Sequence, residues 1–169
     1  MSEKTDKSRD ADRKKTGISK TTLIVIGIVI VIAIAAVAGF VFLKNGAAPA
    51  GASDSFTKAG ALYSQSVDLA NAGKYQEALD KADAALVYNV SSLNPLIQSN
   101  RAGILVMLGR NNEAVAAADV AINAPGNLTT LRSIAYYNKG NALTALNRTA
   151  EANAAYANAT ALDPALKHP

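Results

Sequence analysis

Few side chains in this sequence could carry acid–base, nucleophilic or metal chemistry. The chain has no cysteine and a single histidine, His168, so it lacks a thiol nucleophile, a histidine-based catalytic triad and a multi-histidine metal site. The glycines are scattered and do not form a phosphate-binding loop. Asp80 and Asp83 share one helix face, where solvated carboxylates are the ordinary case. We therefore expect no enzyme activity, no cofactor and no metal site.

Asparagine modification is the other chemistry that the sequence offers. Three of its Asn-x-Ser/Thr sequons fall in predicted loops or turns, where a bulky glycan can be accommodated. We expect N-glycosylation of these sites if this part of the chain lies outside the cytoplasmic membrane. The four sequons begin at Asn89, Asn127, Asn147 and Asn158.

Positive charge is concentrated at the N-terminus. Residues 1–20 contain seven Lys or Arg and four Asp or Glu, which gives this segment +3 of the net charge of +4. The pI of about 9.3 therefore reflects a short basic tail and not a basic surface for nucleic acid. We expect this tail to be disordered and cytoplasmic, and we expect no nucleic-acid partner.

Residues 21–43 form a run of 23 residues without a charge or a proline. At a rise of about 1.5 Å per residue, a helix of this length crosses the roughly 30 Å hydrocarbon core of a bilayer. Seven basic residues precede the run, and only Lys44 and Lys58 follow it closely, so the positive-inside rule places the N-terminus inside. We predict a signal anchor, a single transmembrane helix in contact with membrane lipid, with the rest of the chain outside.

Two other interpretations of this segment remain open. Ala48-Pro49-Ala50 resembles a signal-peptide cleavage site, although the apolar run is longer than the roughly 7 to 15 residues of a signal peptide. Lys14-Lys15-Thr16-Gly17 faintly resembles the prepilin-type signals of pilin-like proteins, but Lys20 departs from that pattern.

The remainder of the chain has the composition of a helical domain on a tether. Residues 44–55 are small and polar and include glycine and proline, which predicts a flexible linker. From Phe56 onward no strand-like alternation occurs, and proline stands only at segment boundaries. We predict an all-α domain over residues 56–164.

One pattern occurs three times in this domain. The segments AGKYQEAL (72–79), LGRNNEAV (108–115) and LNRTAEAN (146–153) align without gaps. Each has a glycine or asparagine in the turn, a residue type that tolerates a left-handed helix end. Each also has a glutamate directly before an alanine, and a leucine nine residues before that alanine. The recurring residues are Glu77, Glu113 and Glu151, Ala78, Ala114 and Ala152, and Leu69, Leu105 and Leu143.

The recurring alanines have a physical reason. A methyl group at a crossing point lets two antiparallel helices approach closely while leucines fill the flanks. Each glutamate falls in the first turn of a predicted second helix, where its charge suits the positive helix end and it can reach back toward the cap. Because such units have no deep core of their own, we expect neighbouring units to complete one another.

This pattern resembles the tetratricopeptide repeat (TPR) family. The first copy departs from the family pattern at Gln65 and Ser66, and the second at Gln98. The resemblance implies an all-α, right-handed superhelix of three helix-turn-helix units, at about 59–92, 95–128 and 133–166. The matching residues of the third copy are Tyr136, Gly140, Leu143, Ala152, Tyr156, Ala159 and Leu162-Asp163-Pro164.

The resemblance also implies a binding surface, the inner groove lined by the first helix of each unit. Tyr63, Ile134 and Asn138 stand where carboxylate-binding members carry basic residues, so capture of a free C-terminal carboxylate is not expected. A neutral groove suits an extended peptide or a helix. The residues expected to line it are Tyr63, Val67, Asn71, Ser99, Gly103, Val106, Tyr137, Asn138 and Asn141.

These observations together predict a single-pass membrane protein that displays three TPR units outside the cytoplasmic membrane. We expect it to act as an adaptor or scaffold for a protein or peptide partner. In architecture alone this resembles the TPR accessory subunits of secretory translocons. The alternatives are a structural subunit of a cell-surface filament or envelope, and a placement of the repeats in the cytoplasm.

The end of the repeat array is expected to support weak self-association. Repeat arrays usually finish with a helix that covers the last apolar face, whereas only five residues follow Pro164. We expect a weak homo-oligomer through the shallow apolar face of the last helix. That face is formed by Ala154, Ala155, Ala157, Ala161 and Leu162.

Overall fold

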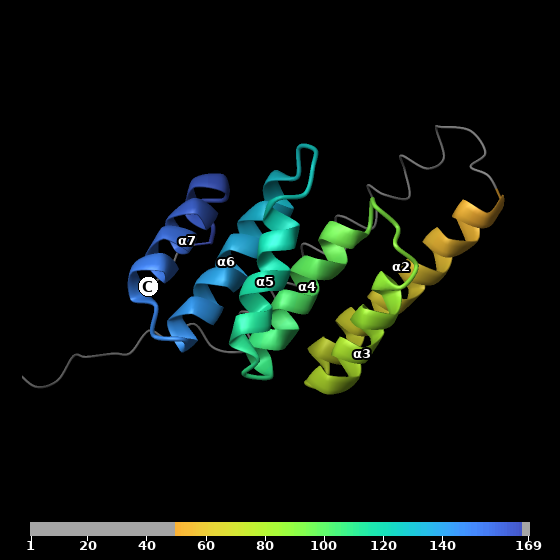
Figure 1. Ribbon diagram of the computed structural model, residues 1–169, viewed down its shortest axis with the longest axis horizontal. Coiled ribbons are helices and arrows are strands. Elements are labelled where there is room, and N and C mark those ends of the chain that lie inside the picture. Colours follow the sequence, from red (N-terminus) through yellow and green to blue (C-terminus); the bar gives the residue numbers. More distant parts are fainter. Residues whose placement is uncertain (1–49, 167–169) are drawn as a thin grey trace, which may run out of the picture.

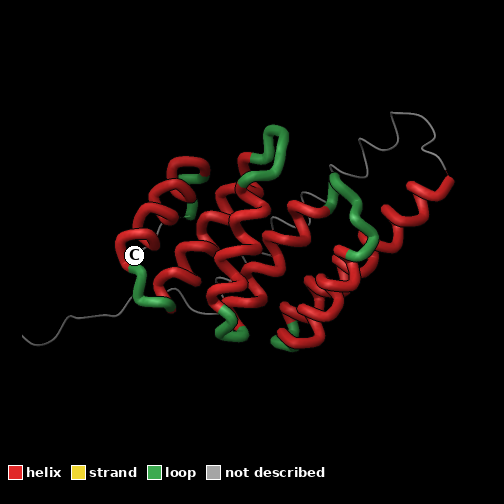
Figure 2. Tube along the Cα trace, viewed as in Figure 1, coloured by secondary structure: helices red, strands yellow, loops and turns green. Residues whose placement is uncertain are grey.

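The computed structural model describes residues 50–166. The predicted tail (1–20) and the predicted transmembrane run (21–43) lie outside the described residues. Within residues 50–166 the chain forms six α-helices and no strand (Figure 1 and Figure 2), which confirms the predicted all-α class. None of these six helices combines the length and apolar character needed to cross a membrane. They are α2 (Ala50–Asn71), α3 (Tyr75–Leu86), α4 (Asn94–Met107), α5 (Asn111–Ile122), α6 (Thr129–Ala145) and α7 (Thr149–Leu162).

Consecutive helices pair as helical hairpins, α2 with α3, α4 with α5 and α6 with α7. The hairpins stack in chain order, with α4 against α3 and α6 against α5 (Figure 1). α4 also contacts α2 on one side and α6 on the other, so the first helices of the three hairpins are neighbours. This arrangement confirms the predicted stack of three helix-turn-helix units.

α2 begins earlier than the sequence pattern predicted. Its first residue is Ala50, so residues 50–55 of the predicted flexible linker are helical. Lys58 pairs with Asp54 one helical turn away, at 2.8 Å, and such spacing supports a helix. Phe56 packs against the apolar cluster between α2, α3 and α4, which ties this end of the helix to the domain.

The turn inside each hairpin ends the first helix with a left-handed residue, as predicted. Gly73, Gly109 and Asn147 have φ angles of 76°, 73° and 59°. The N–H of the next residue then donates to the carbonyl five residues back, as Lys74 does to Leu69 at 2.9 Å. This is a Schellman motif, and it satisfies carbonyls that the helix end leaves free. The recurring leucine is therefore the acceptor residue of each turn.

The recurring glutamates lie in the first turn of α3, α5 and α7, as predicted. They do not cap the helix, because these helices have no side-chain hydrogen bond at the N-cap. Each glutamate pairs with the basic side chain three residues earlier. The pairs are Lys74 with Glu77 at 3.5 Å, Arg110 with Glu113 at 2.6 Å and Arg148 with Glu151 at 2.6 Å.

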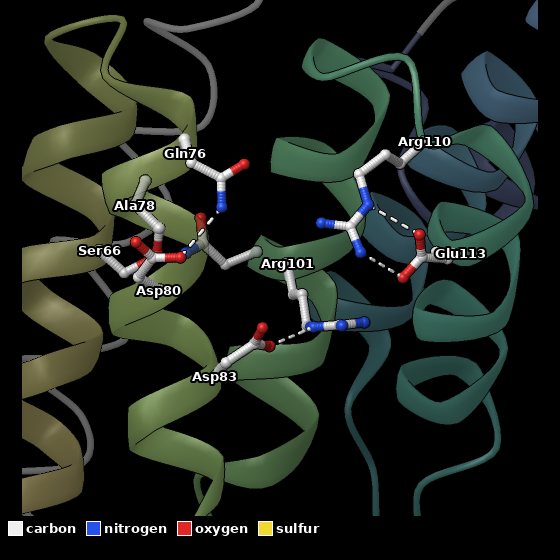
Figure 3. A network of polar contacts seen from close by, with 9 residues as sticks. Ser66, Gln76, Ala78, Asp80, Asp83, Arg101, Arg110 and Glu113 are labelled. Atoms are coloured by element: carbon white, nitrogen blue, oxygen red, sulfur yellow. Dashed lines mark hydrogen bonds and ion pairs between the residues drawn. The ribbon is translucent and has the colours of Figure 1, made fainter.

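The helix crossings show a match of side-chain sizes. A Cβ atom on Gly140 would lie 2.5 Å from a ring carbon of Tyr156, so the large ring occupies the space that the glycine leaves. In the first hairpin the equivalent pair is Ser66 and Ala82, and both are buried. The Ser66 hydroxyl donates to the carbonyl of Ala78 at 2.8 Å and accepts from Asn100 at 2.9 Å (Figure 3). Ser66 departs from the family pattern, and these two hydrogen bonds satisfy its buried hydroxyl.

Candidate functional site

The nine predicted groove residues lie on α2, α4 and α6, the first helices of the hairpins. They differ widely in exposure. Val67, Ser99 and Tyr137 are buried, Asn71 is exposed, and Tyr63, Gly103, Val106, Asn138 and Asn141 are partly buried.

The α4–α6 half of this inner face is closed by contacts between the two helices. The side-chain amide of Asn138 donates to the carbonyl of Ser99 at 3.1 Å. A Cβ atom on Gly103 would lie 3.3 Å from the same amide nitrogen, which is tight van der Waals contact. Three predicted groove residues therefore join the second hairpin to the third.

Tyr137 is part of the core of the third hairpin. Its side chain is 9 % exposed, and its ring meets that of Tyr156 edge-on, with 5.5 Å between centroids. Burial raises the pKa of both phenols. The Tyr156 hydroxyl donates to Oδ1 of Asn141 at 2.8 Å, so this buried tyrosine holds the amide of a groove residue in place.

The α2–α4 half has fewer contacts between its two helices. α2 and α4 contact each other over a much shorter stretch than α4 and α6 do. The largely buried Tyr63 lies on this side, with its ring against a cluster that includes Ala59, Ala82 and Ile97. Burial raises the pKa of Tyr63 to about 12, so its hydroxyl keeps its proton. Within the described part of the chain that hydroxyl has no hydrogen-bond partner, which leaves it free to donate to a ligand.

Every basic side chain on α2, α4 and α6 is already engaged. Arg101 and Lys139 reach back to the preceding hairpin and pair with Asp83 and Asp119, each at 2.6 Å (Figure 3 shows the first pair). Arg132 donates to the carbonyls at the end of α5, and Lys58 pairs with Asp54 on α2 itself. The inner face therefore offers no unpaired cation among the described residues.

Sequence reasoning missed the two ion pairs between hairpins, although both follow the repeat. The aspartates stand five residues after the recurring alanines Ala78 and Ala114, and the basic residues stand four residues before the recurring leucines of the next unit. A comparison of all repeat positions by charge, and not by size alone, would have found them.

No protein-family model matches the sequence, and a comparison with curated proteins finds no significant match. Solved structures do match. The first TPR domain of Spaghetti (RPAP3), bound to the HSP90 peptide SRMEEVD, has a TM-score of 0.56 and 27 % identity, covering 64 % of this chain and 81 % of that chain. The NMR structure of the first TPR domain of human RPAP3 has a TM-score of 0.56 and 26 % identity, covering 63 % and 80 %.

The described part of the chain has the tetratricopeptide repeat fold, and residues 50–166 are called the TPR domain below. A TPR-like protein from Chlorobium tepidum shares the fold, with a TM-score of 0.62 at 22 % identity, over 70 % of this chain and 87 % of that chain. TPR folds are in general interaction modules without catalytic activity.

All four sequon asparagines of the TPR domain are exposed. Asn89 and Asn147 have left-handed backbones, with φ angles of 47° and 59°. Asn127 accepts a hydrogen bond from the hydroxyl of Thr129, two residues on, at 2.9 Å. Asn158 lies on α7. Glycosylation of these four asparagines stays a prediction. Their exposed side chains would be accessible to the modifying enzyme.

The edge of the TPR array at α7 differs from the predicted association face. Ala155 is only 5 % exposed and packs with Tyr137 and Leu166, so its inclusion in an exposed face was wrong. Leu166 folds back onto α7, and its carbonyl accepts from the Thr160 hydroxyl at 3.0 Å. α7 also carries the exposed Asn153 where the other two hairpins have Leu79 and Val115. Self-association stays a prediction. The exposed face of α7 through which it would occur is more polar than the sequence predicted.

Proposed function

We propose that this chain is a membrane-anchored adaptor whose TPR domain holds a peptide or helix of a partner protein on its inner face. The observation that carries this proposal is the α2–α4 half of that face. Tyr63 offers a hydroxyl without a partner among the described residues, and α2 and α4 contact each other over a shorter stretch than α4 and α6 do. The HSP90 peptide bound to the first TPR domain of RPAP3 supports peptide binding by this fold.

We further propose that the bound segment is uncharged, or is held by its main chain. All basic side chains on α2, α4 and α6 are engaged in other contacts, so a free carboxylate would find no cation on this face. A phenol donor and the partly buried Val106 suit a main-chain carbonyl beside an apolar side chain.

The anchor and its orientation rest on residues 1–43. The uncharged run of residues 21–43 and the basic residues before it support a single span with the TPR domain on the outer side. A filament or envelope subunit, the alternative, would sediment as a polymer after detergent extraction, whereas an adaptor would remain a small particle.

A photocrosslinking experiment tests the proposed site in the full-length protein. A photoreactive side chain replaces the exposed Asn71 on α2 or, as a control, the exposed Asn112 on α5. We expect a partner protein to be crosslinked from position 71 and not from position 112. Equal crosslinking from both positions, or none from either, would contradict the proposed face.

The role of the phenol is tested by Tyr63→Phe in the protein crosslinked from position 71. Loss of one hydrogen bond of about 0.5 to 1.5 kcal/mol predicts a roughly two- to tenfold loss of crosslinked product. Tyr88→Phe is the matched control, because Tyr88 lies outside the helices and is partly exposed. An unchanged yield of crosslinked product with Tyr63→Phe would show that the Tyr63 hydroxyl does not contribute to binding.

A further inference from the structure

The two ends of the TPR stack differ in charge. The α3–α4 loop (87–93) and the α5–α6 loop (123–128) contain no charged residue. They lie at the end of the stack where α2 begins, at the top in Figure 1. Each turn at the opposite end contains a basic residue that pairs with a glutamate in the following helix. The two loops at one end of the domain are therefore uncharged, although the Lys58–Asp54 pair on α2 brings charges to that end. The turns at the other end each carry an ion pair.

The uncharged end also carries the most exposed large apolar side chain of the described residues. Val87 is 82 % exposed, and Tyr88 beside it is 37 % exposed. The loop is held in place, since Val90 and Leu93 pack into the core beneath it. The N–H groups of Tyr88 and Asn89 also bond back to the end of α3, at 3.3 Å and 3.0 Å. The exposure of Val87 is thus a feature of an ordered loop.

This loop lies beside the segment that leads to the proposed membrane span. Phe56 on α2 packs in the same cluster as Leu86 and Val90. From Lys58 back to Ala50, α2 covers about 12 Å. Residues 44–49 add at most about 20 Å when extended. The tether therefore keeps the loop within reach of the lipid headgroups.

We propose that this end of the TPR domain rests on the surface of the membrane in which residues 21–43 are anchored, with Val87 and Tyr88 at the lipid interface. The inference rests on the proposed anchor. Tyrosine and apolar side chains favour the region between headgroups and hydrocarbon. The uncharged loops bring no repelling charge to that surface. The bilayer is the occupant, and a second copy or a partner protein is an outcome that the test separates.

The test uses the full-length chain, which contains no tryptophan, in vesicles of phosphatidylcholine and phosphatidylglycerol. Val87→Trp and Met107→Trp place single probes at opposite ends of the domain, because Met107 is 41 % exposed and precedes the turn between α4 and α5. We expect lipid brominated near the headgroup to quench the probe at 87 at least twofold and to leave the probe at 107 unchanged. Equal quenching of both probes, or of neither, would overturn the inference.

A second measurement keeps Val87 and Tyr88 intact. The chain has no cysteine, so Ser91→Cys and Asn112→Cys each accept one nitroxide label at an exposed position. We expect the label at 91 to be accessible to oxygen in the bilayer and protected from a water-soluble relaxation agent, and the label at 112 to behave in the opposite way. Adding Val87→Glu and Tyr88→Ser should return the label at 91 to water.

The outcomes are distinguishable from failure of the anchor. If the protein does not float with the vesicles, the proposed membrane span is contradicted. Protein that floats, but whose label at 91 is accessible to water, would retain the span and overturn the membrane contact. The label at 91 could instead be shielded only at high protein density, with no quenching of the probe at 87 by lipid. This result would indicate that the loop contacts a second copy of the protein, and it would also overturn the proposal.

Discussion

At the scale of single residues, Gly140 and Tyr156 set the clearest steric constraint. A Cβ atom at position 140 would lie 2.5 Å, 2.6 Å and 2.8 Å from three ring carbons of Tyr156. We predict that Gly140→Ala lowers the free energy of unfolding by about 1 to 3 kcal/mol, because the ring or the helices must move apart. Thermal and urea unfolding of the full-length protein in detergent, followed by circular dichroism, would measure this.

Gly60→Ala is the matched control for that prediction. Gly60 lies within α2, and nothing stands within 4 Å of an added Cβ atom. Alanine there should raise the stability by about 0.5 to 1 kcal/mol through its better helix propensity. Adding Tyr156→Ala to Gly140→Ala should cost less than the sum of the two single changes. Destabilisation of equal size in Gly60→Ala and Gly140→Ala would contradict the steric explanation.

At the scale of the helices, the exposed ion pairs at the hairpin turns predict a pH dependence. Hydrogen bonds from Arg110 and Arg148 hold the pKa values of Glu113 and Glu151 below their usual range. The folded protein therefore binds these protons less readily than the unfolded chain does. Their stabilisation is present above the ordinary glutamate pKa of about 4.3 and is lost as the pH falls through the lower folded values.

We predict that Glu113→Gln/Glu151→Gln flattens the acid limb of the stability curve. The urea midpoint of the variant should change less between pH 6 and pH 3 than that of the parent protein. The effect should be small, because exposed pairs are screened by solvent. Glu77→Gln is the control, since its partner Lys74 lies farther away, at 3.5 Å. If the urea midpoints of the parent protein and the double variant change with pH in parallel, the arginines do not stabilise the fold by lowering the pKa values of these glutamates.

Much of the arrangement of helices was predictable, because the constraints recur along the chain. The left-handed turn residues and the buried alanines follow one spacing in all three units, so each copy supports the others. The state of the inner face was not predictable in the same way. Tyr137 is buried because Tyr156 lies opposite it, and Ala155 is covered because Leu166 folds back. Both contacts depend on residues that the repeat does not share.

At the scale of the whole molecule, the testable property is the orientation of the proposed membrane span. Seven basic residues precede the proposed span and few follow it, so residues 44–169 should lie outside and residues 1–20 inside. Protease added to intact cells or spheroplasts should digest the TPR domain and spare an epitope on the N-terminal tail. Detergent-lysed cells, in which both ends are cleaved, are the control. Protection of the TPR domain in intact cells would reverse the topology.

The ion pairs between hairpins have a consequence for how the array can be lengthened. At the positions of these pairs, the first hairpin carries Gln65 on its outer side and the third carries Ala157 on its outer side. Only the middle hairpin carries both halves of the junction, Arg101 toward one neighbour and Asp119 toward the other. A duplicated middle hairpin, spliced in tandem, would regenerate the junction between its two copies. By this charge pattern, the middle hairpin is the one unit of the three that could be repeated in tandem, whereas each outer hairpin carries one half of a junction.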